Sequence, residues 1–147
     1  MSKIKVGIIG VGSCAKSLVE GVQYYNENPE DKVGLMYPDI GGYGTKDIEF
    51  VMGFDIDVRK VNKPLAEALR AAPNCSMNHV NTIHTNGDSN SSCVKSKAMV
   101  YSAPELDGIA PHMHDYPDEV TFVNGAIPAE SFDRTVELIK YHDVDVL

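Results

Sequence analysis

Near its start the chain joins an apolar run, a loop with two closely spaced glycines and an amphipathic segment, KIKVGIIGVGSCAKSLVEGV. Residues 3–9 become wholly apolar toward their end, as expected for a strand buried on both faces of a sheet. Residues 14–25 predict a helix, because their apolar positions follow one helical face: Ala15, Leu18, Val19 and Val22. A buried strand that turns through glycines into a helix is typical of α/β proteins. This opening therefore favours an α/β fold.

Three later segments predict further strands. Residues 48–54 (IEFVMGF) are rich in β-branched and aromatic residues, and residues 98–101 (AMVY) form a shorter apolar run. Residues 143–147 predict the beginning of a fourth strand. Strands that alternate with helices build a doubly wound parallel sheet, so we predict a Rossmann-like α/β fold. We expect the sheet to be incomplete at its C-terminal end.

Two segments between these strands predict helices. Residues 58–71 place apolar side chains on one helical side, although Pro64 within them either starts the regular helix or kinks it. Residues 126–141 predict the clearest late helix, with Pro128 early enough to be an N-terminal proline.

Two other segments predict long connections. Residues 26–46 contain two prolines and four glycines, and residues 74–93 are dense in Asn and Ser, which predicts a mobile loop or an insertion. At 147 residues the chain has the usual size of one domain. We therefore expect residues 1–147 to belong to a single α/β unit.

The loop after the first strand fits the pattern G-x-G-x-x-G/A. Its residues are Gly10, Val11, Gly12, Ser13, Cys14 and Ala15. In a dinucleotide site the first glycine permits the tight turn, the second lets a pyrophosphate approach the backbone, and the third small residue lets helix and strand pack closely. The anion then lies on unpaired amides at the helix N-terminus. The alternative is a glycine-rich turn needed only for close packing.

A dinucleotide site also needs a carboxylate at the end of the next strand, where it accepts hydrogen bonds from the adenosine ribose. Asp31 lies at about the usual distance but follows NENPE, which cannot be a buried strand, and Asp39 follows VGLMYP, where Pro38 interrupts. Asp55 directly follows IEFVMGF and is the better candidate. The connection before it is long, which costs little because loop closure depends weakly on length.

The residues around Asp55 bear on which cofactor is bound. A carboxylate at this place favours NAD over NADP, because it repels a 2′-phosphate. Arg59 and Lys60 follow closely and weaken that inference without reversing it. Asp55 and Asp57 also fit a solvated strand end that begins a helix, where Asp57 is an N-cap.

Charge and cysteine content exclude several classes of protein. A formal net charge of −8 argues against non-specific nucleic-acid binding, which depends on Lys and Arg. No apolar run approaches the ~20 residues of a membrane span, and no signal peptide is recognisable. The three cysteines are an odd number at unrelated spacings, which favours free thiols and a cytoplasmic location.

Two other groups of reactive residues are weaker candidates. His112, His114 and Asp115 are close in sequence, but a metal site usually needs three or four converging ligands, so we predict none. Cys14 lies at a helix N-terminus, where the pKa of a thiol tends to fall, yet the sequence offers no base beside it. We expect Cys14 to be a small residue beside the cofactor.

Longer stretches of the sequence resemble one family. VGSCAKSLVEGVQYY, GLMYPDIGGYGTKDIEFVMGFDIDVRKVNKPLAEAL and PELDGIAPHM are similar to the N-terminal part of myo-inositol-1-phosphate synthase (inositol-3-phosphate synthase). The resemblance spans nearly the whole chain and includes the long connection before Asp55. It implies an NAD-dependent isomerase of inositol and phospholipid biosynthesis. In that family, glucose 6-phosphate is oxidised by NAD, closes by an aldol step and is reduced again.

The resemblance also implies roles for individual residues. The loop Gly10, Val11, Gly12, Ser13, Cys14 and Ala15 is expected to line the pyrophosphate. Asp55 is expected at the ribose, with Ile56 and Asp57 beside the adenosine. Ser102, Ala103 and Pro104 are weaker candidates for lining the cofactor cleft. Ser13 and Asn62 depart from the family, which has asparagine and glycine at these places.

The family's sugar-binding and proton-transfer residues follow much later, in a separate catalytic domain. We therefore expect this chain to be the N-terminal part of a longer synthase, inactive alone toward glucose 6-phosphate and without catalytic residues of its own. The resemblance also implies a homo-oligomer, a tetramer in the family. Two alternatives stay open: the cofactor domain of an NAD-dependent sugar or amino-acid dehydrogenase, and a non-catalytic nucleotide-binding module.

Overall fold

The computed structural model describes residues 2–80, 96–106, 110–124 and 129–147. The order of elements is β1 (Ile4–Ile9), α1 (Ser13–Glu27), η1 (Thr45–Asp47), β2 (Ile48–Asp55), α2 (Leu65–Ala68), β3 (Met99–Ser102), η2 (Pro111–Asp115) and α3 (Phe132–Tyr141), where η marks a 3₁₀ helix. The strands expected at residues 3–9, 48–54 and 98–101 and the helix expected at 14–25 are confirmed within one or two residues.

The three strands form a parallel sheet in the spatial order β1-β2-β3. On the other side of β1, Val146 pairs with Val6 in parallel, and its carbonyl accepts from Gly7 N at 2.8 Å. The C-terminal residues thus occupy the place of a fourth strand, as predicted. The resulting order 3-2-1-4 is that of the first part of a doubly wound sheet. The Rossmann-like α/β fold class is confirmed.

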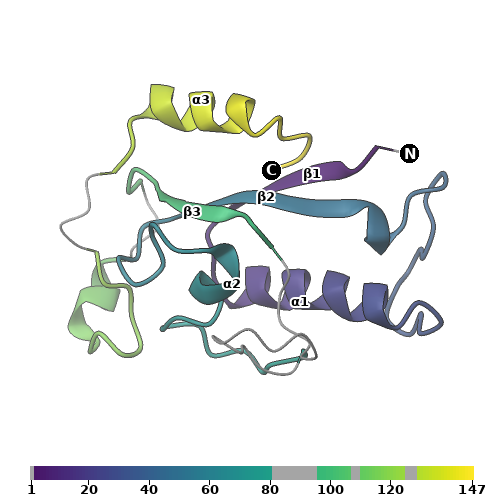
Figure 1. Ribbon diagram of the computed structural model, residues 1–147. Helices are drawn as coiled ribbons and strands as arrows, with labels where there is room; N and C mark the ends of the chain where they lie inside the picture. The colour runs from purple at the N-terminus through teal and green to yellow at the C-terminus, as the bar shows by residue number, and fades with distance from the viewer. Residues whose placement is uncertain (1, 81–95, 107–109, 125–128) are drawn as a thin grey trace.

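Helices cover both faces of this sheet (Figure 1): α3 lies on one face, and α1 and α2 lie on the other. Side chains of β2 alternate between the two faces, as a strand requires. Met52 and Phe54 pack with Leu138 of α3, whereas the Cα of Gly53 faces Val11 and Leu65. Each face therefore has its own apolar core.

The helix expected over residues 58–71 is mostly wrong. Only Leu65–Ala68 is helical, and Pro64 directly precedes it, so this proline starts the regular helix. Before it, Asn62 N donates to Val100 O at 2.8 Å, and Val100 N donates to Lys63 O at 2.9 Å. Asn62 also has a left-handed φ of 60°. This backbone pairs with β3 and cannot simultaneously make helical hydrogen bonds.

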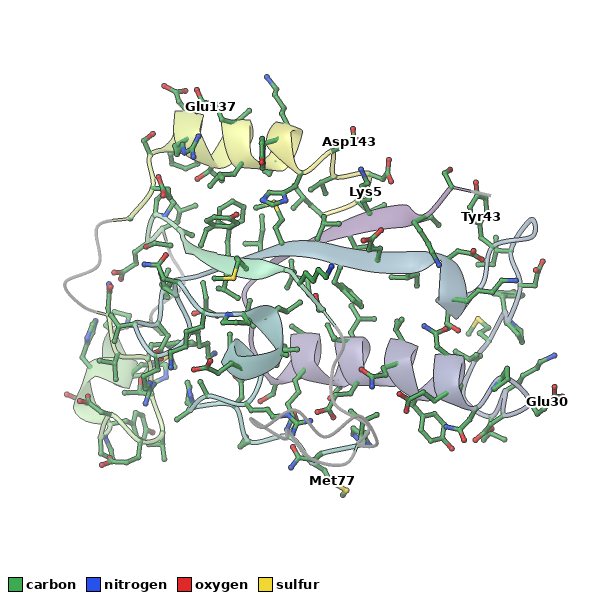
Figure 2. All side chains as sticks on the ribbon, viewed as in Figure 1. Lys5, Glu30, Tyr43, Met77, Glu137 and Asp143 are labelled. Carbon is green, nitrogen blue, oxygen red and sulfur yellow. The ribbon has the colours of Figure 1, made fainter. Side chains whose placement is uncertain are left out.

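The helix expected over residues 126–141 begins later than predicted. Residues 129–131 are not helical, and the expected N-terminal Pro128 lies outside the described residues. Ser131 is the N-cap of α3, because its side chain accepts a hydrogen bond from Arg134 N. Beyond the helix, Asp143 forms an ion pair of 3.0 Å with Lys5 of β1, which Figure 2 shows at the surface.

Both predicted connections are mostly irregular where they are described, although residues 26–27 end α1 and residues 45–46 belong to η1. Within residues 26–46 there is no strand, and Tyr24 and Tyr25 of α1 hold the connection through hydrogen bonds to Asp31 and to Val33 O. Residues 74–80 lie along α1, where Cys75 N donates to Ser13 Oγ at 3.1 Å. The rest of the polar stretch, residues 81–93, lies outside the described residues.

Candidate functional site

A pocket of about 340 Å³ lies where the carboxyl ends of β1 and β2 meet the glycine loop. Its lining residues are Ile9, Gly10, Gly12, Phe54, Asp55, Ile56, Ala103, Pro104, Glu105, Leu106 and Phe122. The carboxyl ends of parallel strands, beside the point where strand order reverses, are the usual ligand site of doubly wound sheets. We take this pocket as the candidate site.

Gly10 and Gly12 are glycines for different structural reasons. Gly10 has a φ of 87°, a left-handed conformation that side chains rarely adopt, so the turn out of β1 requires it. Gly12 is the N-cap of α1 with an ordinary φ of −92°. A Cβ added at Gly12 would meet no described atom within 4 Å. The described fold therefore leaves open space above Gly12, and a ligand that approaches the backbone closely could use it.

The structure brings half of the predicted site residues together at this pocket. Gly10, Gly12, Asp55, Ile56 and Ala103 line the pocket, as does Pro104. The remaining predicted residues are not among those that line it: Val11, Ser13, Cys14, Ala15, Asp57 and Ser102. Among these, Ser13 and Cys14 open α1 and are at least partly exposed, whereas the other four are buried. Cofactor contacts of all these residues stay predictions.

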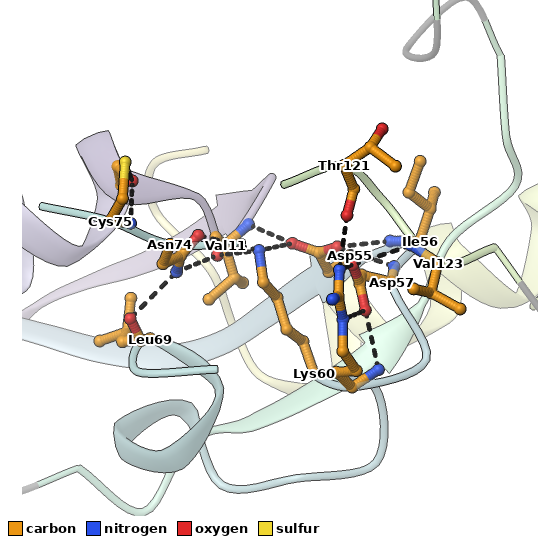
Figure 3. Close-up of polar contacts among 12 residues, drawn as sticks. Val11, Asp55, Ile56, Asp57, Lys60, Leu69, Asn74, Cys75, Thr121 and Val123 are labelled. Carbon is orange, nitrogen blue, oxygen red and sulfur yellow. Dashed lines mark hydrogen bonds and ion pairs between the residues drawn. The ribbon is translucent and has the colours of Figure 1, made fainter. Parts of the chain in front are cut away.

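Asp55 ends β2 and is bonded to the glycine loop (Figure 3). Its Oδ2 accepts from Val11 N at 2.8 Å, and its Oδ1 accepts from Ile56 N and Asp57 N at 2.8 and 2.9 Å. The residue is only 6% exposed. A carboxylate offers about four acceptor positions, and the one beyond these three bonds is on Oδ2, which also faces the Lys60 ammonium at 3.6 Å. Asp55 thus fixes the loop, and its predicted contact with a ribose depends on that remaining position.

Sequence reasoning missed two residues that contact the loop. Lys60 is fully buried, and its Nζ donates to Val11 O at 2.9 Å and to Asn74 Oδ1 at 3.0 Å (Figure 3). The same ammonium lies 3.6 Å from Asp55 Oδ2. Asn74 Nδ2 also donates to Val11 O, at 3.0 Å. No pattern in the sequence marks these two side chains, because they reach Val11 from distant segments.

Asp57 and Arg59 form a second buried network. The Asp57 carboxylate accepts from Arg59 N and Nε and from Val123 N, while Arg59 also donates to Thr121 O. Burial by itself raises the pKa of Asp57, but the side-chain hydrogen bond from Arg59 and the backbone donors hold that pKa below its ordinary value. This network ties residues 118–124, including the pocket residue Phe122, to the end of β2.

The described residues contain neither a metal-ligand cluster nor a membrane-spanning helix. Among the described residues, no three His, Cys, Asp or Glu side chains converge as metal ligands would. His112 and His114 lie in η2 and are not among the residues that line the pocket. No helix in the described ranges is both long and apolar enough to cross a bilayer.

Three sequence relatives are inositol-3-phosphate synthases. The protein from Corynebacterium glutamicum is 40% identical over 122 residues, covering 82% of this chain and 31% of the relative. Those from Mycolicibacterium smegmatis and Mycobacterium tuberculosis (strain H37Rv) are 37% and 35% identical, each over 99% of this chain and 35% of the relative. The chain therefore spans about a third of the length of the curated relatives it matches. No family profile matches it.

Two solved structures share the fold. A crystal structure of Ari2 superposes with a TM-score of 0.66 at 21% identity, over 99% of this chain and 37% of that one. A myo-inositol-1-phosphate synthase-related protein from Thermotoga maritima gives a TM-score of 0.65 at 19% identity, over 98% and 33%. At such low identity these matches support the fold and carry no further conclusion.

Proposed function

Because this chain belongs to the inositol-3-phosphate synthase family, we propose that it forms the NAD-binding, N-terminal part of such a synthase. The full protein would convert glucose 6-phosphate to 1D-myo-inositol 3-phosphate for inositol and phospholipid biosynthesis. NAD, when bound, supplies the acceptor for a hydride and later returns it, so the reaction consumes no net reductant. The role of this chain is to bind and orient the cofactor throughout that cycle.

The open space above Gly12 is the observation that carries this proposal. Gly12 caps α1, whose first-turn amides have no partner within the helix and whose dipole favours an anion. Because a Cβ there would meet no described atom, the fold does not by itself explain glycine at this position. Close approach of a diphosphate to the backbone does explain it. The residues present therefore fit a dinucleotide.

The surroundings of Asp55 support NAD over NADP. The two cations that could have received a 2′-phosphate are already engaged: Lys60 is fully buried, and Arg59 donates to Asp57 and to two backbone carbonyls. Four of the five N–H donors of the Arg59 guanidinium are used in such bonds, and acceptors enclose the Lys60 ammonium. The Asp55 carboxylate itself repels a 2′-phosphate.

The remaining parts of the proposal follow from the family. We infer that the groups acting on the sugar belong to the other two thirds of a synthase, so that the 147-residue chain converts no glucose 6-phosphate. We also infer a cytoplasmic homo-oligomer. Appearance of inositol phosphate from the purified chain would contradict the first of these inferences.

Calorimetric titration of the chain with NAD and NADP tests the cofactor assignment. We expect NAD to bind more tightly than NADP, and Gly12→Ala to weaken NAD binding by about tenfold, because its methyl group occupies the space of the diphosphate. Gly21→Ala adds the same methyl group in α1, also with no described atom within 4 Å, and is the matched control. Equal affinity for both cofactors, or unchanged binding in Gly12→Ala, would refute the assignment.

A further inference from the structure

The N–H and the carbonyl of Val11 both form hydrogen bonds with side chains from other segments of the chain. Its N–H donates to Asp55 Oδ2 at 2.8 Å, and its carbonyl accepts from Lys60 Nζ at 2.9 Å and from Asn74 Nδ2 at 3.0 Å. The Val11 side chain is itself fully buried. Figure 3 shows these contacts converging on Val11 from β2, from the turn after it and from the segment after α2.

The planarity of the peptide bond gives this arrangement a directional consequence. In a trans peptide the carbonyl and the following N–H point in opposite directions. Because Lys60 and Asn74 hold the Val11 carbonyl toward the interior, the N–H of Gly12 is directed away from it. Gly12 itself lines the candidate pocket. The direction of the Gly12 amide is thus set by Lys60 and Asn74, which bind the carbonyl on the opposite side of the same peptide.

We propose that Lys60 is a positioning residue that holds the Val11–Gly12 peptide with its N–H toward the cofactor diphosphate, assisted by Asn74. The inference rests on the proposed function for the identity of the ligand. Lys60 does not touch that ligand, because its ammonium is enclosed by Val11 O, Asn74 Oδ1 and Asp55 Oδ2.

The burial of Lys60 favours this role over a simple packing role. An ammonium group is costly to remove from water unless acceptors surround it. Here the acceptors come from three separate segments, and one of them is the carbonyl of the glycine loop. An apolar side chain could fill the same volume but could not fix the direction of a carbonyl.

The test compares ligands with and without phosphates. In Lys60→Met we expect the Kd for NAD and for ADP-ribose to rise about tenfold, the effect of weakening one amide–anion hydrogen bond. The Kd for adenosine, followed by NMR titration, should change less than twofold. The Gly12 amide resonance should shift in the ligand-free variant. Lys63→Met removes a nearby lysine that is 39% exposed and pairs with Glu67, and it should leave all these values unchanged.

The possible outcomes separate this inference from the proposed function. If the wild type binds no NAD, the proposed function fails, and the Gly12 resonance still tests the orientation of the peptide. The positioning role is refuted if Lys60→Met binds NAD with the Kd of the wild type. It is also refuted if the Kd for adenosine rises as much as the Kd for ADP-ribose. If Lys60→Met does not fold, Asn74→Ala replaces it. That variant removes one of the two donors to Val11 O and should weaken ADP-ribose binding about threefold, again without affecting adenosine. A loss without that selectivity would refute the role.

Discussion

Asp57 shows at the scale of single residues how a buried charge joins distant parts of this chain. Its carboxylate is inaccessible to solvent and binds both Arg59 and the backbone of Val123. A buried carboxylate with these donors is stabilised in its ionised form, which lowers its pKa. Such a carboxylate stabilises the protein at pH values at which it is ionised in both the folded and the unfolded chain.

Asp57→Asn should therefore destabilise the protein in a pH-dependent way. We expect a loss of about 2 kcal/mol at pH 7, because hydrogen bonds to charged groups are lost. The pKa of Asp57 is lowered on folding, so its contribution is present above the unfolded value of about 4 and disappears as the pH falls through the folded value. Urea unfolding of both proteins from pH 7 to pH 3 checks this. A difference that grows toward low pH would contradict it.

Two glycines illustrate constraints at the scale of elements. Gly53 lies in β2, where an added Cβ would come within 3.0 Å of Val11 Cγ2 and 3.5 Å of Val100 Cγ2. Gly21 lies in α1, where an added Cβ would meet no described atom within 4 Å. The first glycine lets strand and glycine loop pack closely, whereas the second only makes the helix more flexible.

Gly53→Ala and Gly21→Ala should consequently change stability in opposite directions. We expect Gly53→Ala to lower the free energy of unfolding by about 1–3 kcal/mol, because Val11 is buried and clamped and cannot give way. Gly21→Ala should raise it by about 0.5–1 kcal/mol. Chemical denaturation of the two variants provides the measurement. Equal effects would show that the close packing over Gly53 is unimportant.

The start of α3 depends on one side chain. Ser131 accepts a hydrogen bond from Arg134 N and so satisfies a free amide of the first turn. Ser131→Ala should cost about 1 kcal/mol in unfolding experiments. Ser131→Asp keeps an acceptor and should retain most of the stability. If both variants lose the same amount, the cap is not what begins this helix.

At the scale of the whole molecule, cofactor binding should be visible as stabilisation. The proposed site joins β1, α1, β2 and the residues after β3, so a ligand there binds the folded chain and not the unfolded one. With NAD at a hundred times its Kd, we expect about 2.7 kcal/mol of added stability and a rise in Tm of about 5–10 °C. Scanning calorimetry with NAD checks this, and Gly12→Ala should show a smaller rise at the same concentration. An unchanged Tm would argue against a site in the folded chain.

Elements with a local sequence pattern could be predicted without the structure. The apolar run, the glycine pair and the helical spacing predicted β1, the loop and α1, and the apolar segments before Asp55 and Ser102 predicted β2 and β3. These predictions succeed because a strand buried on both faces and an amphipathic helix need only neighbouring residues to be recognised. Asp55 lies beside the glycine loop because β1 and β2 are parallel, so that their carboxyl ends lie at the same edge of the sheet.

Contacts between distant segments could not be predicted and became visible when the chain was seen folded. The apolar spacing of residues 58–71 predicts a helix, but the backbone at Asn62 and Lys63 pairs with Val100 instead. In the sequence, Lys60 is a cation that weakens the preference for NAD over NADP. In the structure it is buried against Val11 and Asn74. These outcomes depend on hydrogen bonds between residues far apart in the chain. A local pattern carries no information about such partners, because burial and the demand for buried polar groups to be paired arise only when the segments pack together.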